Sequence, residues 1–212
     1  MRNADICGSG KAIVHPHAVR PSEREEKTVI LITAFEPFGG SLINTSAEVL
    51  RLLPDTIAGH PVRKLLLPVV FGKAAETALQ FPADYIFLLG EAGGRKTVTP
   101  ERRAKNLRDA RIPDNEGNQP KKETILSHGP AEYRTALPLD KIAAGLREDA
   151  IEISEDAGAF VCNDTFYLVG TGSSVPVEFI HVPAAPDQAE AYAKTLKRFI
   201  ALAVTAAQSA IR

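Results

Sequence analysis

Continuous apolar runs recur along the chain and are separated by polar stretches. Residues 29–32 form a run of branched apolar residues, and residues 84–90 contain a second one. Because such runs carry no polar face, they are typical of buried strands of a parallel sheet. Further strands are predicted over residues 62–70, 151–154 and 177–180.

Amphipathic segments alternate with these strands. A helix is predicted over residues 46–53, because Thr45 and Glu48 have the spacing of a capping box. Further helices are predicted over residues 71–79, 139–149 and 188–210. Strands that alternate with helices favour the α/β class, so we expect a single-domain three-layer α/β/α sandwich with a twisted, largely parallel central sheet.

The domain organisation follows from length and composition. The chain has 212 residues, of which 44% are hydrophobic and 24% are charged, enough for one sizeable core. Residues 1–27 lack periodicity, so we expect a flexible N-terminal extension followed by one domain over residues 28–212. Cys7, His15 and His17 lie in this extension with a spacing that matches no zinc pattern, so no metal site is expected there.

Charge and hydropathy exclude several classes of function. With a net charge of −1, the chain lacks the excess of positive charge that is typical of proteins that bind nucleic acid or an anionic membrane. No stretch approaches the roughly 18 apolar residues of a membrane-spanning helix, and residues 12–14 are too short a run for a secretory signal. The only cysteines are Cys7 and Cys162, so a disulfide framework is not expected. We therefore expect a cytoplasmic protein that acts on small molecules or peptides.

Cys162 is the first candidate for chemistry. It directly precedes a predicted helix start over residues 163–168. A cysteine in an apolar run is usually a buried and inert side chain. At a helix N-terminus, however, the unpaired N–H groups and the helix dipole favour the thiolate, which is the nucleophilic form. The position of Cys162 alone leaves both interpretations open.

A thiol nucleophile needs a base, and the base needs a partner that orients its ring. His181 is the best candidate, because it follows a predicted strand and would lie at the carboxyl edge of the sheet, where α/β proteins bind ligands. The other four histidines fall in the extension or in polar turns: His15, His17, His60 and His128. Glu101 is a candidate third member in the long polar stretch 96–138, although periodicity does not distinguish it from other acids.

Six short motifs follow one another along the chain. They are Phe-Glu-Pro-Phe-Gly-Gly at 35–40, Gly-Glu-Ala-Gly-Gly-Arg at 90–95, Thr-Pro-Glu-Arg at 99–102 with Asn106, Ala-Arg-Ile-Pro-Asp-Asn at 110–115, Ala-Gly at 157–158 with Val-Cys-Asn at 161–163, and Phe-Ile-His-Val-Pro at 179–183. Together and in this order they resemble the pyroglutamyl peptidase I family, the pyrrolidone-carboxylate peptidases. The resemblance runs from about residue 29 to the C-terminus.

The resemblance implies a phosphorylase/hydrolase-like fold and a cysteine peptidase that removes N-terminal pyroglutamate from peptides through a thioester, without a metal or cofactor. It implies that Cys162 is the nucleophile, His181 the general base and Glu101 the group that orients the imidazole. The Cys162 N–H and the Arg111 side chain would bind the oxyanion. The family also implies a homo-oligomer, specifically a tetramer.

The resemblance further implies a pocket for the pyroglutamyl ring. Phe35 and Phe38 would line the ring, the Glu91 backbone would meet the lactam N–H, and Asn44 would meet the lactam carbonyl. A free N-terminal amine in such a pocket would be a desolvated charge without a partner, which explains selection for a blocked terminus.

Two other hypotheses stay open. The interval from Cys162 to His181 is several residues shorter than in the family, so a second hypothesis is a diverged relative that binds pyroglutamate or peptides with little turnover. A third, by analogy of fold, takes residues 93–95 as the phosphate cradle of an enzyme acting on nucleosides. This last interpretation gives Cys162 no role.

Overall fold

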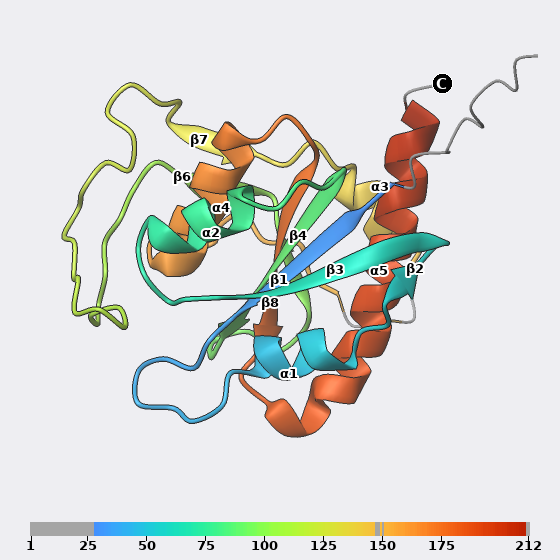
Figure 1. Ribbon diagram of the computed structural model, residues 1–212, viewed down its shortest axis with the longest axis horizontal. Coiled ribbons are helices and arrows are strands. Elements are labelled where there is room, and N and C mark those ends of the chain that lie inside the picture. Colours follow the sequence, from blue (N-terminus) through green and yellow to red (C-terminus); the bar gives the residue numbers. More distant parts are fainter. Residues whose placement is uncertain (1–27, 147–148, 150, 211–212) are drawn as a thin grey trace, which may run out of the picture.

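A computed structural model describes residues 28–146, 149 and 151–210 of the chain (Figure 1). The extension expected over residues 1–27, with Cys7, His15 and His17, lies outside the described residues. A six-stranded sheet crosses the middle of the described part, and helices cover both of its faces.

The central sheet has the strand order β2-β3-β1-β4-β8-β5. These strands are β1 (Ile30–Phe35), β2 (Thr56–Ile57), β3 (His60–Leu67), β4 (Tyr85–Ala92), β5 (Thr99–Glu101) and β8 (Val177–Pro183). The pairs β1–β3, β1–β4 and β4–β8 are parallel, whereas the edge strands β2 and β5 are antiparallel to their neighbours. The predicted largely parallel sheet is thus confirmed. A second sheet pairs β6 (Arg103–Lys105) with β7 (Glu132–Arg134).

The helices form the two outer layers. They are α1 (Thr45–Leu52), α2 (Lys73–Leu79), α3 (Leu139–Ala144), α4 (Val161–Gly172) and α5 (Ala189–Ala210), with a 3₁₀ turn η1 at Pro186–Gln188. Helices α2 and α4 pack together on one face of the sheet, and α1, α3 and α5 lie on the other (Figure 1). The three-layer α/β/α architecture predicted from the sequence is therefore present.

Alternation along the strands assigns each side chain to one of two apolar cores. Phe87 and Ile180 pack with α1 and α5, whereas Leu88 and Phe179 pack with α2 and α4. Because successive side chains of a strand point to opposite faces, His181 shares the face of Phe179. The histidine therefore faces α4, the helix that carries Cys162.

Two predicted elements differ from the structure. The third helix ends at Ala144, with Gly145 as its C-cap, and not at residue 149. The predicted strand over residues 151–154 forms only isolated bridges, from Ile151 to Val98 and from Ser154 to Glu101. These bridges nevertheless hold the segment against the edge strand β5.

The N-cap of α1 is Asn44, not Thr45. The Asn44 side chain accepts a hydrogen bond from the Ser46 N–H at 3.0 Å. Asparagine is as good an N-cap as serine or threonine, so a one-residue shift costs the helix nothing. The shift matters for the site, because Asn44 was expected to bind substrate.

In the described ranges, no helix has both the length and the apolar composition needed to cross a membrane.

Candidate active site

Cys162 is the second residue of α4. The chain enters this helix through Gly158, whose φ of +84° is a conformation that favours glycine. The next residue, Asn163, fixes the helix start: its side chain donates to the Lys105 and Leu107 carbonyls and accepts from the Lys105 N–H, all within 2.9 Å. The nucleophile candidate therefore stands on a firmly anchored helix N-terminus.

His181 and Glu101 meet through the antiparallel pairing of β5 with β8. In this register Thr99 pairs with His181 and Glu101 pairs with Phe179, so the glutamate shares the face of the histidine. His181 Nδ1 lies 2.7 Å from Glu101 Oε1. Both side chains are buried, and Glu101 is fully so. The bond occupies one ring nitrogen and leaves Nε2 for a proton transfer.

Gly90 brings Cys162 next to this pair. A Cβ added at Gly90 would lie 3.0 Å from the Cys162 sulfur and 2.7 Å from Phe179 Cζ. Gly90 is also the register partner of His181 in the β4–β8 pairing. The sulfur thus rests on the sheet backbone beside His181, and both residues line one cavity of about 460 Å³. The short connection over residues 173–176 does not separate them.

The environment of the sulfur disfavours the thiolate. Cys162 is partly exposed to the cavity, but protein atoms surround most of its sulfur. Burial, together with the charges of Glu101 and Glu91, raises the pKa of the Cys162 thiol to about 12, and only its own backbone N–H opposes this rise. In the free protein this environment favours the thiol, so the position of Cys162 at a helix N-terminus does not by itself make it a thiolate.

Arg95 completes the surroundings of Glu101. Its Nη2 donates to Glu101 Oε1 at 2.7 Å, to Ser154 Oγ at 2.8 Å and to the Asp156 carbonyl at 2.9 Å. From the sequence, Arg95 belonged to the family motif at 90–95 and to the possible phosphate cradle at 93–95, and no contact with Glu101 was predicted for it. The three acceptors share the two hydrogens of Nη2 and commit this nitrogen to protein contacts, which gives the cradle no support.

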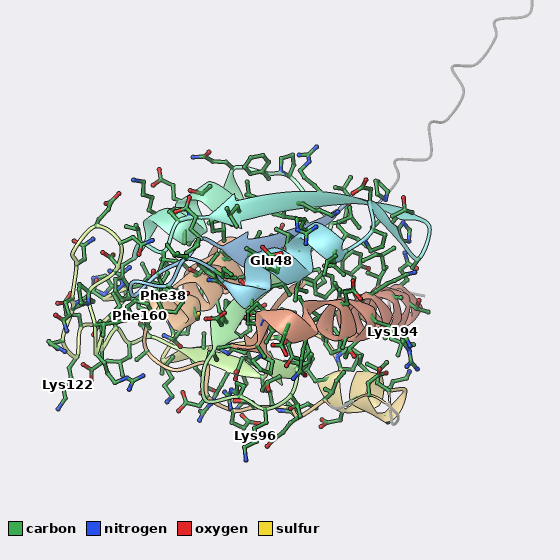
Figure 2. The ribbon with its side chains drawn as sticks, turned by 90° about the horizontal axis from the view of Figure 1, so that it is seen from below. Phe38, Glu48, Lys96, Lys122, Phe160 and Lys194 are labelled. Atoms are coloured by element: carbon green, nitrogen blue, oxygen red, sulfur yellow. The ribbon has the colours of Figure 1, made fainter. Side chains whose placement is uncertain are left out.

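A narrow second cavity adjoins Cys162. Its lining is largely aromatic and apolar: Phe35, Phe38, Asn44, Val69, Glu91, Phe160, Val161 and Cys162. The rings of Phe38 and Phe160 lie side by side with centroids 6.0 Å apart (Figure 2). No role was predicted for Phe160 from the sequence, although its position two residues before Cys162 indicated that it borders the site.

The two polar residues of the narrow cavity are already engaged by the protein. Asn44 Nδ2 donates to the Glu36 carbonyl at 2.9 Å while its oxygen caps α1. Glu91 Oε2 accepts from the Thr45 N–H at 2.6 Å. Substrate contacts at Asn44 and at the Glu91 backbone stay predictions, and the amide of Asn44 would have to share its hydrogen bonds.

Arg111 also lines the large cavity. It is exposed, and no other described residue binds its side chain. Its loop is tied to the Phe38 loop, because Asn115 Nδ2 donates to the Pro37 carbonyl at 3.0 Å. The long polar stretch after β4 thus supplies Arg111, which lines the cavity, and Glu101, which is buried and bound to His181.

No group of three or more potential metal ligands occurs within the described ranges. The arrangement is that of a thiol, an imidazole and a carboxylate in sequence, with a free guanidinium nearby, and such a constellation can perform acyl transfer.

Comparison with known proteins agrees with this geometry. The sequence model of the pyroglutamyl peptidase family matches residues 28–211. This chain belongs to the pyroglutamyl peptidase family. It is 42% identical over 170 residues to the pyrrolidone-carboxylate peptidase of Staphylococcus saprophyticus, covering 75% of this chain and 80% of the relative. It is 44% identical over 167 residues to that of Chromobacterium violaceum, covering 76% and 80%.

Solved structures of this family share the fold. The Bacillus amyloliquefaciens pyroglutamyl peptidase I superposes with a TM-score of 0.78 at 36% identity, over 84% of this chain and 98% of that chain. The Thermus thermophilus pyrrolidone carboxyl peptidase gives 0.75 at 34% identity, over 84% and 99%.

Proposed function

We propose that this family member is a cysteine omega peptidase that removes N-terminal pyroglutamate from peptides, with Cys162, His181 and Glu101 as its catalytic triad. One observation carries the assignment: the 2.7 Å bond between His181 Nδ1 and Glu101 Oε1, with His181 and Cys162 lining the same cavity. The names of the relatives support the substrate.

The reaction begins with proton transfer from the thiol. His181 Nε2 accepts the proton of Cys162 as the sulfur attacks the pyroglutamyl carbonyl, so that a carbon–sulfur bond forms and the carbonyl oxygen takes the negative charge. Collapse of this intermediate breaks the amide bond, and His181 returns the proton to the departing amine. Water activated by His181 then cleaves the thioester and restores the thiol.

The raised thiol pKa fits general-base catalysis. Because the free thiol holds its proton, deprotonation accompanies attack and requires a correctly oriented imidazole. Glu101 supplies this orientation and stabilises the imidazolium. The Cys162 N–H at the start of α4 and the Arg111 side chain stabilise the oxyanion, since the first N–H groups of a helix have no intrahelical acceptor.

The narrow cavity gives the enzyme its preference for a blocked terminus. The narrow cavity has a volume of only about 10 Å³ in this structure, so it must widen to admit the flat lactam ring between the apolar walls of Phe35, Phe38 and Phe160, where Glu91 and Asn44 supply the bordering polar groups. A free ammonium would lose its hydration among these rings, which is costly. The lactam N–H and carbonyl need only one acceptor and one donor.

We also propose, from the family resemblance, that the enzyme acts in the cytoplasm as a homo-oligomer, a tetramer. We place its single domain at residues 28–212. Light scattering coupled to size exclusion tests the assembly. A variant that lacks residues 1–27 should keep wild-type kcat/KM if the extension has no part in catalysis.

Hydrolysis of a pyroglutamyl aminomethylcoumarin amide tests the function. The wild type should release the fluorophore, and Cys162→Ala should reduce kcat at least about 10³-fold because the nucleophile is gone. The glutaminyl amide, which carries a free amine, is the matched substrate control. No turnover by the wild type, together with calorimetric binding of pyroglutamate, would instead favour the diverged binding protein.

A further inference from the structure

Arg95 borders the large cavity but not the narrow ring pocket. It follows β4 in a turn closed by the bond from its own N–H to the Ala92 carbonyl at 3.0 Å. We propose that Arg95 is a positioning residue that keeps Glu101 ionised and aimed at His181. This role builds on the proposed peptidase function and adds a fourth side chain to its triad.

The geometry gives Arg95 and His181 one shared acceptor. Arg95 Nη2 and His181 Nδ1 each lie 2.7 Å from Glu101 Oε1, so the two nitrogens are at most twice that distance apart. The second oxygen, Oε2, is buried and has no hydrogen-bond partner within the described ranges. Two donors from different directions therefore fix the one oxygen that orients the imidazole.

The burial of Glu101 makes this cation necessary. The carboxyl group is fully buried, and a buried carboxylate without a paired charge is strongly disfavoured. Arg95 is the sole arginine or lysine that forms an ion pair with Glu101 in the described part of the chain. Without it, Glu101 would favour a neutral or displaced state, and neither state stabilises an imidazolium.

Arg95 also connects Glu101 to the segment that leads to the nucleophile. The same Nη2 donates to Ser154 Oγ and to the Asp156 carbonyl, two residues before the Gly158 turn that opens the path to α4. A single guanidinium thus links the end of β4, the acid on β5 and the entrance to the nucleophile helix. A change at Arg95 should therefore affect chemistry more than substrate binding.

Other charges near the pair do not replace Arg95. Glu178 on β8 and Cys162 on α4 interact electrostatically with Glu101, and neither is a cation. The remaining titratable or charged side chains near the pair or along the cavity are Glu91, Arg102, Asp109, Arg111 and Asp156. Arg102 pairs with Asp140 and Glu155 at the surface.

The experiment compares Arg95→Met, Arg95→Lys and a control, Arg103→Met. Arg103 has a similarly exposed side chain, 32% against 30%, and binds Glu132 and the Glu155 carbonyl away from the triad. For each protein, kcat and KM for the pyroglutamyl amide are measured from pH 5 to 9. Titration of the His181 ring protons by NMR adds a readout that needs no turnover.

We expect Arg95→Met to lower kcat ten- to a hundredfold with KM changed less than threefold. A neutral or displaced Glu101 no longer stabilises the imidazolium, so the acid limb of the kcat/KM profile and the His181 titration should both move to lower pH. Arg95→Lys keeps the charge and should recover most of kcat and the wild-type acid limb. Arg103→Met should match the wild type.

Two results would overturn the role of Arg95. The first is an Arg95→Met enzyme with the kcat and the acid limb of the wild type. The second is an equal loss of kcat in Arg95→Met and Arg95→Lys while the acid limb stays at the wild-type pH in both. If Arg95→Met does not fold, a displaced acid limb in Arg95→Lys refutes the proposal. An inactive wild type would refute the peptidase function, whereas the NMR titration would still decide whether Arg95 controls the pair.

Discussion

Glu178 carries a buried carboxyl group whose effect on the stability of the fold can be measured. It lies on β8 with no exposed surface, and neither of its oxygens has a well-formed hydrogen bond to another described residue. Burial raises its pKa well above the usual range. The nearby Thr135 hydroxyl opposes this rise, the charge of Glu101 adds to it, and the Glu101 N–H and the charge of Arg102 oppose it. We predict that Glu178→Gln stabilises the protein increasingly as pH rises.

The sign follows from proton binding. Between the unfolded-state pKa, about 4.3, and the raised native pKa, the native protein holds a proton on Glu178 that the unfolded chain has lost. Stability in this window therefore falls as pH rises, by about 1.4 kcal/mol per pH unit. For a domain of this size that slope corresponds to roughly 3–6 °C in Tm per pH unit. Glutamine does not titrate and escapes the loss.

Thermal unfolding by differential scanning fluorimetry from pH 5 to 8 measures the effect. The Tm of Glu178→Gln minus that of the wild type should grow with pH, whereas the exposed Glu152→Gln control should give a constant difference. A Glu178→Gln difference that stays constant over this range would show that the carboxyl group ionises as freely in the native protein as in the unfolded chain.

Three further predictions concern the architecture of the site. Gly90→Ala should lower kcat/KM more than about 100-fold and lower the free energy of unfolding in urea by about 1–3 kcal/mol, because the methyl group would meet the Cys162 sulfur and a buried ring. Wild-type activity would contradict the close packing. In steady-state kinetics, Phe160→Ala should raise KM about five- to twentyfold with little change in kcat, because one wall of the pocket is lost. An unchanged KM would show that Phe160 does not contact the substrate. Asp164→Ala should lower the free energy of unfolding by about 2–4 kcal/mol in a urea titration, since the buried carboxylate binds Arg108 at 2.6 Å and the Gly72 N–H. An unchanged urea midpoint would mean that this ion pair makes no net contribution to stability.

The strands were predictable because their apolar runs are long and continuous. The apolar runs at 29–32 and 84–90 largely overlap β1 and β4, respectively. Each strand continues beyond its run into polar or small residues. Boundaries were less predictable, because the capping-box spacing of Thr45 and Glu48 is only a local signal. Asn44 takes the cap because its side chain also reaches the Glu36 carbonyl, a tertiary contact.

The site was predictable only in part. His181 lies in β8, whose largely apolar run at 177–180 is visible in the sequence. Glu101, however, lies on a three-residue edge strand too short to leave a periodic pattern, and only the family motifs indicated it. The partners of Arg95 lie 6, 59 and 61 positions away along the chain, so no local rule could pair them. The role of Gly90 depends on the register of two strands and on the placement of a helix.

The protonated state of the Cys162 thiol has a consequence for the life of the enzyme. Oxidation to sulfenic acid and higher states proceeds through the thiolate, and a pKa of about 12 leaves very little of it in the resting protein. If His181 removes this proton only during turnover, as we propose, the resting enzyme should survive peroxide that would oxidise a standing thiolate. Sensitivity to oxidants would then report occupancy of the active site and not merely the presence of a cysteine.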